Sequence, residues 1–95
     1  MVYEPQAIDT SNVQLDEEIL QLIERLAENV HNNWTRERIA TGWRYGLPRD
    51  NNSKENPFLV PYQDLPESEK ELNRRVIMET LKAMLALGYH IEKVP

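Results

Sequence analysis

The sequence predicts a small, mainly α-helical domain with two long helices, a long structured connection between them and short strands. Two stretches carry the apolar spacing of a helical face, and the segment between them is interrupted by glycine, proline and asparagine. The 95 residues fit one domain with a modest core. We expect residues 1–13 to form a flexible N-terminal arm, because they lack apolar periodicity, and residues 14–95 to form the folded domain.

The first helical pattern runs from about residue 15 to residue 31. Its first turn is acidic, which suits the positive end of the helix dipole. We expect a break near Asn32 and Asn33, because Ile39 lies off the face that continues beyond them, and we expect Gly42 to end the helical stretch. The apolar face consists of Ile19, Leu22, Ile23, Leu26 and Val30.

The connection from residue 43 to residue 61 is rich in turn-forming residues. Residues 43–45 and 58–60 are the two segments that suit a short extended conformation. Because two helices enclose little core alone, we expect the connection to cover one side of them. The side chains expected to do so are Trp34, Ile39, Trp43, Tyr45, Phe58 and Leu59.

A last long helix is predicted to start near Pro66 and to end at Gly88, with a short extended tail beyond it. Proline is well tolerated in a first helical turn, and glycine readily takes the left-handed conformation that ends a helix. The apolar face of this helix consists of Leu72, Val76, Ile77, Thr80, Leu81, Met84 and Leu87.

Composition excludes several classes of partner. The formal net charge of −5 disfavours a long nucleic acid, and no apolar run approaches the roughly 20 residues that a membrane span needs. The first residues do not resemble a signal peptide, so we expect a cytoplasmic protein that binds no membrane. Cysteine is absent, and His31 and His90 are far apart, so we expect neither a metal site nor a cofactor.

The sequence contains no recognisable catalytic motif. The serines lie outside any nucleophile-elbow pattern, and the three glycines are not spaced as a phosphate-binding loop. The carboxylates lie on predicted helix starts and faces, where they are usually solvated. We therefore expect no catalytic residues, and an enzyme with an unrecognised site remains an alternative.

Residues 31–46 hold both tryptophans, a tyrosine, three arginines and a histidine. Such a mixture can build an aromatic core covered by arginine stems. It can also leave an aromatic face open beside Arg38, Arg44 or Arg49, where a planar anion such as a nucleotide stacks while guanidinium groups grip its phosphate. Composition favours the core and leaves both interpretations open. The candidate ligand-binding residues are His31, Trp34, Arg38, Trp43, Arg44 and Tyr45.

An ordered set of residues extends this pattern along the chain. It comprises His31-x-x-Trp34-x-x-x-Arg38-Ile39-x-x-Gly42-Trp43-x-Tyr45-Gly46, then Leu59-Val60-Pro61-Tyr62 and Leu65-Pro66-Glu67, and finally Glu79-Thr80-Leu81-Lys82 and Leu85-Ala86-Leu87-Gly88-Tyr89. In this order the residues resemble the RyR domain, the repeat found in tandem in ryanodine-receptor calcium-release channels and as single copies in bacterial and phage proteins. One departure is Asn56, where channel repeats commonly have histidine before the proline matched by Pro57.

The resemblance covers about residues 15–91 and implies a peripheral, non-channel module of the single-copy bacterial or phage type, so that residues 14–95 would be the RyR domain. For bacterial members it implies sensing of nucleotide-like ligands. Channel repeats pair about a pseudo-twofold axis, so we expect this lone copy to form a homodimer. We therefore expect a non-catalytic binding or assembly module in which the tryptophans stack, the arginines contact the anion and His31 forms a hydrogen bond. A purely structural homodimer is the alternative.

Overall fold

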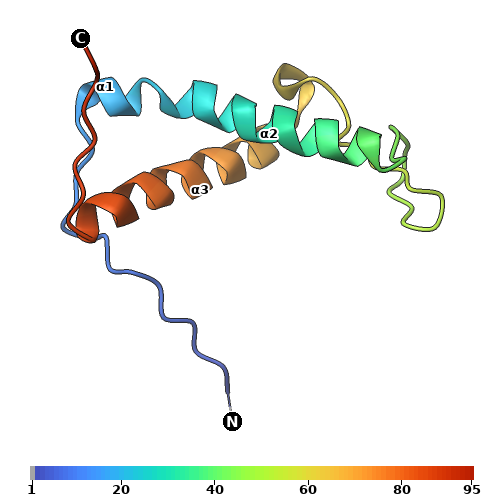
Figure 1. The fold of residues 1–95 in the computed structure, drawn as a ribbon. Helices are drawn as coiled ribbons and strands as arrows, with labels where there is room; N and C mark the ends of the chain where they lie inside the picture. The colour runs from blue at the N-terminus through green and yellow to red at the C-terminus, as the bar shows by residue number, and fades with distance from the viewer. Residues whose placement is uncertain (1) are drawn as a thin grey trace.

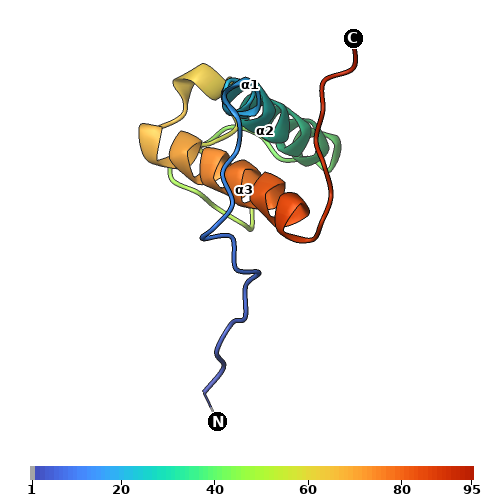
Figure 2. The ribbon, with the colours of Figure 1, turned by 90° about the vertical axis from the view of Figure 1, so that its left-hand side faces the viewer.

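A computed structural model describes residues 2–95 and confirms the mainly helical fold. The helices are α1 (Glu17–Leu20), α2 (Ile23–Ala40), the 3-10 helix η1 (Tyr62–Asp64) and α3 (Glu67–Ala86). The long helices α2 and α3 pack on each other, and the connection leaves the far end of α2 and returns to the start of α3 (Figure 1). The first part of the N-terminal arm extends away from the helices (Figures 1 and 2), whereas the Thr10 hydroxyl donates to Glu79 of α3 at 2.8 Å.

The break in the first helical region lies at residues 21–22, so the expected break at Asn32 and Asn33 is wrong. Helix α2 runs through both asparagines, and the Asn33 side-chain amide donates to the Asn29 carbonyl at 3.0 Å. Asparagine often ends a helix by bonding to nearby backbone, but this bond lies within the helical turn itself. Ile39 lies off the apolar face because it faces solvent, with 60% of its surface exposed.

Glycine ends both long helices, as predicted. Gly42 has a φ of +94° and Gly88 has a φ of +95°, and residues with a Cβ atom rarely adopt these backbone angles. After α2, the Trp43 N–H donates to the Arg38 carbonyl at 2.9 Å, and the Gly42 N–H donates to the Ile39 carbonyl at 3.0 Å. This pair of bonds is a Schellman motif, which turns the chain back over the last helical turn.

The core lies between α2 and the connection. Ala27 is completely buried, Tyr62 and Leu65 are nearly so, and Phe58 and Val60 pack against them. No residue of α3 is buried, so the core is small, and α2 and residues 58–65 supply it. Phe58, one of the side chains expected to cover the helices, packs against this cluster.

Two of the residues expected to cover the helices do not do so. Ile39 and Tyr45 are 60% and 53% exposed, whereas Trp34, Trp43, Phe58 and Leu59 are half-buried or nearly so. The expectation for the first two is wrong. Ile39 lies on a helix and Tyr45 in an extended segment, and the sequence does not show which side of either element meets the core.

Strand pairing within residues 2–95 is limited to isolated bridges. Arg44 pairs with Glu55 in parallel, and Asp50 pairs with Glu55 in the antiparallel sense. These bridges hold residues 44–55 as a closed loop beyond the end of α2. Residues 58–60, the second expected extended segment, take part in neither bridge.

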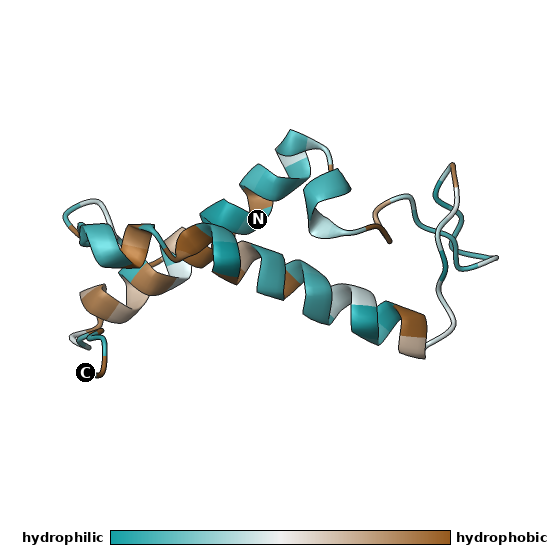
Figure 3. Ribbon diagram, turned by 90° about the horizontal axis from the view of Figure 1, so that it is seen from above, coloured by the Kyte–Doolittle hydropathy of each residue, from teal (hydrophilic) through white to brown (hydrophobic). Residues whose placement is uncertain are grey.

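Helix α3 buries only part of its predicted apolar face. Ile77 and Leu81 are half-buried, whereas Leu72, Val76 and Leu87 are 51%, 61% and 62% exposed. Figure 3 shows hydrophobic residues interrupted by hydrophilic ones along the helices. None of the helices within residues 2–95 combines the length and the apolar character needed to cross a membrane.

An ion-pair network joins the first part of α2 to α3. The Arg74 guanidinium contacts both carboxylate oxygens of Glu24, and its Nη1 lies 2.6 Å from Glu67 Oε1. The hydrogen bond from Arg74 lowers the pKa of Glu24 below its ordinary value. Tyr62 lies beside this network, and burial, together with the neighbouring Glu24 carboxylate, raises the pKa of its hydroxyl to about 12.

Candidate ligand-binding cleft

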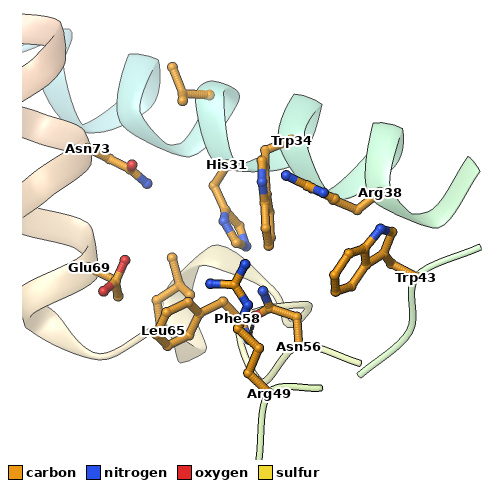
Figure 4. Close-up of a pocket in the computed structure, with 11 residues that line it drawn as sticks. His31, Trp34, Arg38, Trp43, Arg49, Asn56, Phe58, Leu65, Glu69 and Asn73 are labelled. Atoms are coloured by element: carbon orange, nitrogen blue, oxygen red, sulfur yellow. Dashed lines mark hydrogen bonds between the residues drawn. The ribbon is translucent and has the colours of Figure 1, made fainter. Parts of the chain in front are cut away.

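A cleft of about 390 Å³ opens between α2, the start of α3 and the connection, and we call it the α2–α3 cleft. Its volume falls within the roughly 300–1,000 Å³ typical of small-molecule sites. Four of the six candidate binding residues line it: His31, Trp34, Arg38 and Trp43 (Figure 4). The structure therefore brings His31, both tryptophans and one of the three arginines of this segment to one place.

Helix α2 supplies three of these side chains from a single face. His31, Trp34 and Arg38 are spaced by three and four residues, which places them one above the other on a helix. The His31 and Trp34 rings are stacked, with centroids 5.7 Å apart and planes inclined by 28°. The Arg38 guanidinium carbon lies 5.7 Å from the Trp34 ring. The order along this wall is thus imidazole, indole, guanidinium.

Trp43 reaches the same wall through the end of α2. Its N–H donates to the Arg38 carbonyl in the Schellman motif, and its ring lies 5.2 Å from the Arg38 guanidinium carbon. Arg38 consequently lies between two indoles, each within the roughly 6 Å range of a cation–π interaction. All three side chains are half-buried, so the indoles and the guanidinium each retain surface open to solvent.

His31 fixes the connection against α2. Its Nε2 lies 2.7 Å from the Val60 carbonyl oxygen, and the ring is 5% exposed. Because a carbonyl can only accept, Nε2 carries the hydrogen and donates it. In the neutral ring Nδ1 is then an acceptor, and it makes no hydrogen bond within residues 2–95. His31 is therefore a structural clamp between α2 and the connection at one wall of the cleft.

The connection contributes Arg49 and Asn56 to the opposite wall. Arg49 Nε donates to Asn51 Oδ1 at 3.1 Å, and its guanidinium extends towards His31 in Figure 4. Asn56 is 7% exposed, and its Oδ1 accepts from the Phe58 N–H at 2.8 Å. The Asn56 amide nitrogen is thereby left as a donor. The Arg49 guanidinium and the Asn56 amide nitrogen give this wall N–H donors, which suit an anion.

The two cleft arginines lack carboxylate partners. Neither Arg38 nor Arg49 forms an ion pair within residues 2–95, whereas Arg44 pairs with Glu55 at 3.6 Å and Arg74 pairs with three carboxylates. In a chain with a net charge of −5, the two arginines give this part of the cleft two guanidinium groups that no carboxylate contacts directly.

The start of α3 forms the remaining side of the cleft with Glu69 and Asn73. Four residues separate them, so they lie on one helical face. In Figure 4 both side chains lie across the cleft from Arg38 and Trp43. The cleft thus has a carboxylate and an amide at one end, and guanidinium and indole groups at the other.

The model of the RyR domain family matches residues 3–93 of this chain. The chain belongs to the RyR domain family. The α2–α3 cleft of this RyR domain is lined by the His31, Trp34, Arg38 and Trp43 residues of the segment that first indicated the resemblance.

Arg44 and Tyr45, the other two candidate residues, lie outside the cleft of this RyR domain. Their backbone is held by the loop, because the Arg44 N–H donates to the Lys54 carbonyl and the Asn56 N–H donates to the Arg44 carbonyl, both at 3.0 Å. The Arg44 side chain is 72% exposed and Tyr45 is 53% exposed. Successive residues of an extended segment point to opposite sides, but the loop turns both away from the cleft.

Sequence reasoning missed the α3 side of the site. Glu69 and Asn73 carry only the signal of a polar pair four residues apart, and such pairs are common on solvated helical faces. Their place in the cleft depends on how α3 packs against α2. Within the described residues 2–95, no group of three or more histidine, cysteine, aspartate or glutamate side chains is arranged to hold a metal ion.

Proposed function

We propose that this RyR domain is a non-catalytic binding module that takes a small planar anion, such as a nucleotide, into the α2–α3 cleft. The observation that carries the proposal is the position of Arg38 between Trp34 and Trp43, at 5.7 and 5.2 Å from their rings, beside a cleft of about 390 Å³. An aromatic base would stack on an open indole face, and its phosphate would meet the guanidinium groups.

Electrostatics support an anionic ligand over a neutral one. The Arg38 and Arg49 guanidinium groups have no carboxylate partner within residues 2–95, and the Asn56 amide adds an N–H donor. Hydrogen bonds to charged groups contribute about 1.5–3 kcal/mol each, more than neutral ones. A phosphate can accept from both guanidinium groups, so two or three such bonds would give measurable affinity.

The test is a tryptophan fluorescence titration of the whole chain with a panel of nucleotides. Both tryptophans of the chain line the cleft, so a bound base should quench or shift their emission. Arg38→Ala should weaken binding about tenfold or more, since it removes a charged hydrogen bond of at least about 1.4 kcal/mol.

Arg36→Ala is the matched control. Arg36 lies on the same helix and carries the same charge, but it is exposed and bonds to Asn33 at 2.7 Å, away from the cleft. We expect the Arg36→Ala variant to bind nucleotides as tightly as the unmodified chain does. If no nucleotide changes the emission, or if both variants weaken binding equally, the proposal is wrong.

A homodimer is a second candidate role, favoured by the exposed apolar side chains of α3. Leu72, Val76 and Leu87 are each more than half exposed and are spaced along one side of the helix. We propose that a second copy covers them. Sedimentation equilibrium at about tens of micromolar should then show a dimer, and Val76→Glu should shift it to monomer. Only monomer at that concentration would contradict this role.

Absence of catalysis is also a proposal, and it has a direct test. The cleft contains His31 and Glu69 as its titratable acid–base groups, but the His31 Nε2 is occupied by the Val60 carbonyl. We expect no turnover when the chain is incubated with bound nucleotides or with a broad panel of hydrolase substrates. Product formation that is lost in Glu69→Gln would instead support the enzyme alternative.

A further inference from the structure

We propose that Glu69 and Asn73 select the base of the bound nucleotide, and that the cleft prefers guanine to adenine. This inference rests on the proposed binding function of the α2–α3 cleft and identifies the ligand within that class. It is carried by the side of the cleft that α3 forms, which presents one carboxylate and one amide to the space in front of the indoles (Figure 4).

Both side chains are half-buried and without partners. Within residues 2–95 neither Glu69 nor Asn73 makes a side-chain hydrogen bond or an ion pair. Their polar atoms remain open to the cleft, so both groups are available to a ligand. A ligand that supplies N–H donors at this end of the cleft would pair with the carboxylate, which can only accept.

Helix stability explains only part of the pair. Glu67 and Glu69 both lie in the first turn of α3, where carboxylates favour the helix dipole. Glu67 also pairs with Arg74 at 2.6 Å, whereas Glu69 has no ion-pair partner within residues 2–95 and lines the cleft instead. Asn73 lies inside the helix, where asparagine is a weak helix former, so the helix does not account for it.

The charges of the cleft orient the ligand. Arg38 and Trp43 lie on one side, and Glu69 and Asn73 lie on the other, with Arg49 reaching in from the connection (Figure 4). The Glu69 carboxylate repels a phosphate, whereas Arg38 and Arg49 attract it. The phosphate of a nucleotide is thus directed to the arginines, and the edge of its base is directed to α3.

The chemistry of the α3 side distinguishes the purines. An ionised carboxylate only accepts hydrogen bonds, and it can accept two parallel N–H groups. Guanine presents two adjacent donors, its N1–H and its 2-amino group, and its O6 can accept from the Asn73 amide. Adenine places the lone pair of N1 beside its 6-amino group, so one carboxylate oxygen would face an acceptor. Sites built for N–H donors reject analogues that lack them.

The experiment compares GMP, IMP and AMP by calorimetric titration of the full chain. We expect GMP to bind at least about tenfold more tightly than AMP, with IMP between them, because IMP keeps the N1–H and lacks the 2-amino group. Glu69→Gln should lower the affinity for GMP about tenfold and leave the affinity for AMP within about threefold, since the amide no longer accepts at both positions. Asn73→Ala should weaken GMP binding more than AMP binding.

Glu28→Gln serves as the control, because Glu28 is an exposed carboxylate on α2 outside the cleft. It should leave the preference for GMP unchanged, and melting curves should show that every variant is folded. If nucleotides bind through Arg38 but Glu69→Gln leaves the ratio of GMP to AMP affinity unchanged, the inference is wrong and the binding function stands. If no nucleotide binds, both are wrong.

Discussion

The Trp43→Ala variant tests whether Trp43 contacts a bound ligand or serves only to pack the fold. Most of the Trp43 surface is buried and alanine keeps part of the contact, so Trp43→Ala should remove about 100–150 Å², at or below the low end of the roughly 150–250 Å² that a tryptophan buries. At about 25 cal/mol per Å² this area corresponds to about 2.5–4 kcal/mol, which is an upper estimate because unfolded chains are partly compact. Loss of the contact with Arg38 adds about 0.5–1 kcal/mol.

We therefore expect Trp43→Ala to lower the free energy of unfolding by about 2–3 kcal/mol, and the Tm by roughly 10–20 °C for a chain of this size. The Schellman bond survives, because it uses the backbone N–H of residue 43. The assay combines thermal unfolding, followed by circular dichroism, with a nucleotide titration at a temperature at which the variant is folded. Binding at that temperature should be at least about tenfold weaker.

Ile23→Ala provides a matched destabilised control. Ile23 is 6% exposed and lies outside the cleft, and loss of a buried isoleucine side chain costs about 2–5 kcal/mol. It should lower Tm as much as Trp43→Ala does without a change in nucleotide affinity. If the two variants bind equally well when folded, Trp43 is only a packing residue and the account of the cleft is refuted.

Three further changes test other parts of the structure. Gly42→Ala should cost about 1–2 kcal/mol, measured by urea unfolding, because the φ of +94° is strained for alanine. Arg74 lowers the pKa of Glu24 in the folded chain, so this pair should stabilise the fold above pH 4.5, the ordinary pKa value of a glutamate. The stabilisation should be lost as the pH falls through the lower pKa that Glu24 has in the folded chain. Arg74→Met lacks this pair, so its Tm should fall less on acidification than the Tm of the unmodified chain. Tyr62→Phe should leave Tm unchanged or raised, because the buried hydroxyl has no hydrogen-bond partner within residues 2–95, and a clear fall in Tm would contradict this.

The helices and their ends could be predicted because their signals are local. Gly42 and Gly88 end α2 and α3 through a positive φ, which is a property of glycine itself. The expected break at Asn32 and Asn33 was wrong because asparagine can also bond within a helix, as Asn33 does to the Asn29 carbonyl. Local propensity does not decide between these two outcomes.

The candidate site could be predicted only along α2 and its end. His31, Trp34 and Arg38 share a helical face, and Gly42 turns Trp43 back towards Arg38, so their proximity follows from spacing and one glycine. The direction of Tyr45 and the place of Glu69 depend on the loop closure and on the docking of α3. Those contacts join residues far apart in the sequence, and no local pattern encodes them.

The most direct test of the central claim uses the two indole N–H signals of the chain. Trp34 and Trp43 are its only tryptophans, so a ¹H–¹⁵N correlation spectrum resolves one indole signal for each. The account predicts that both signals shift in a saturable manner when GMP is added, and that Arg38→Ala needs at least about ten times more GMP for the same shift. Indole signals that stay in place while the unmodified chain is titrated to millimolar GMP would contradict it.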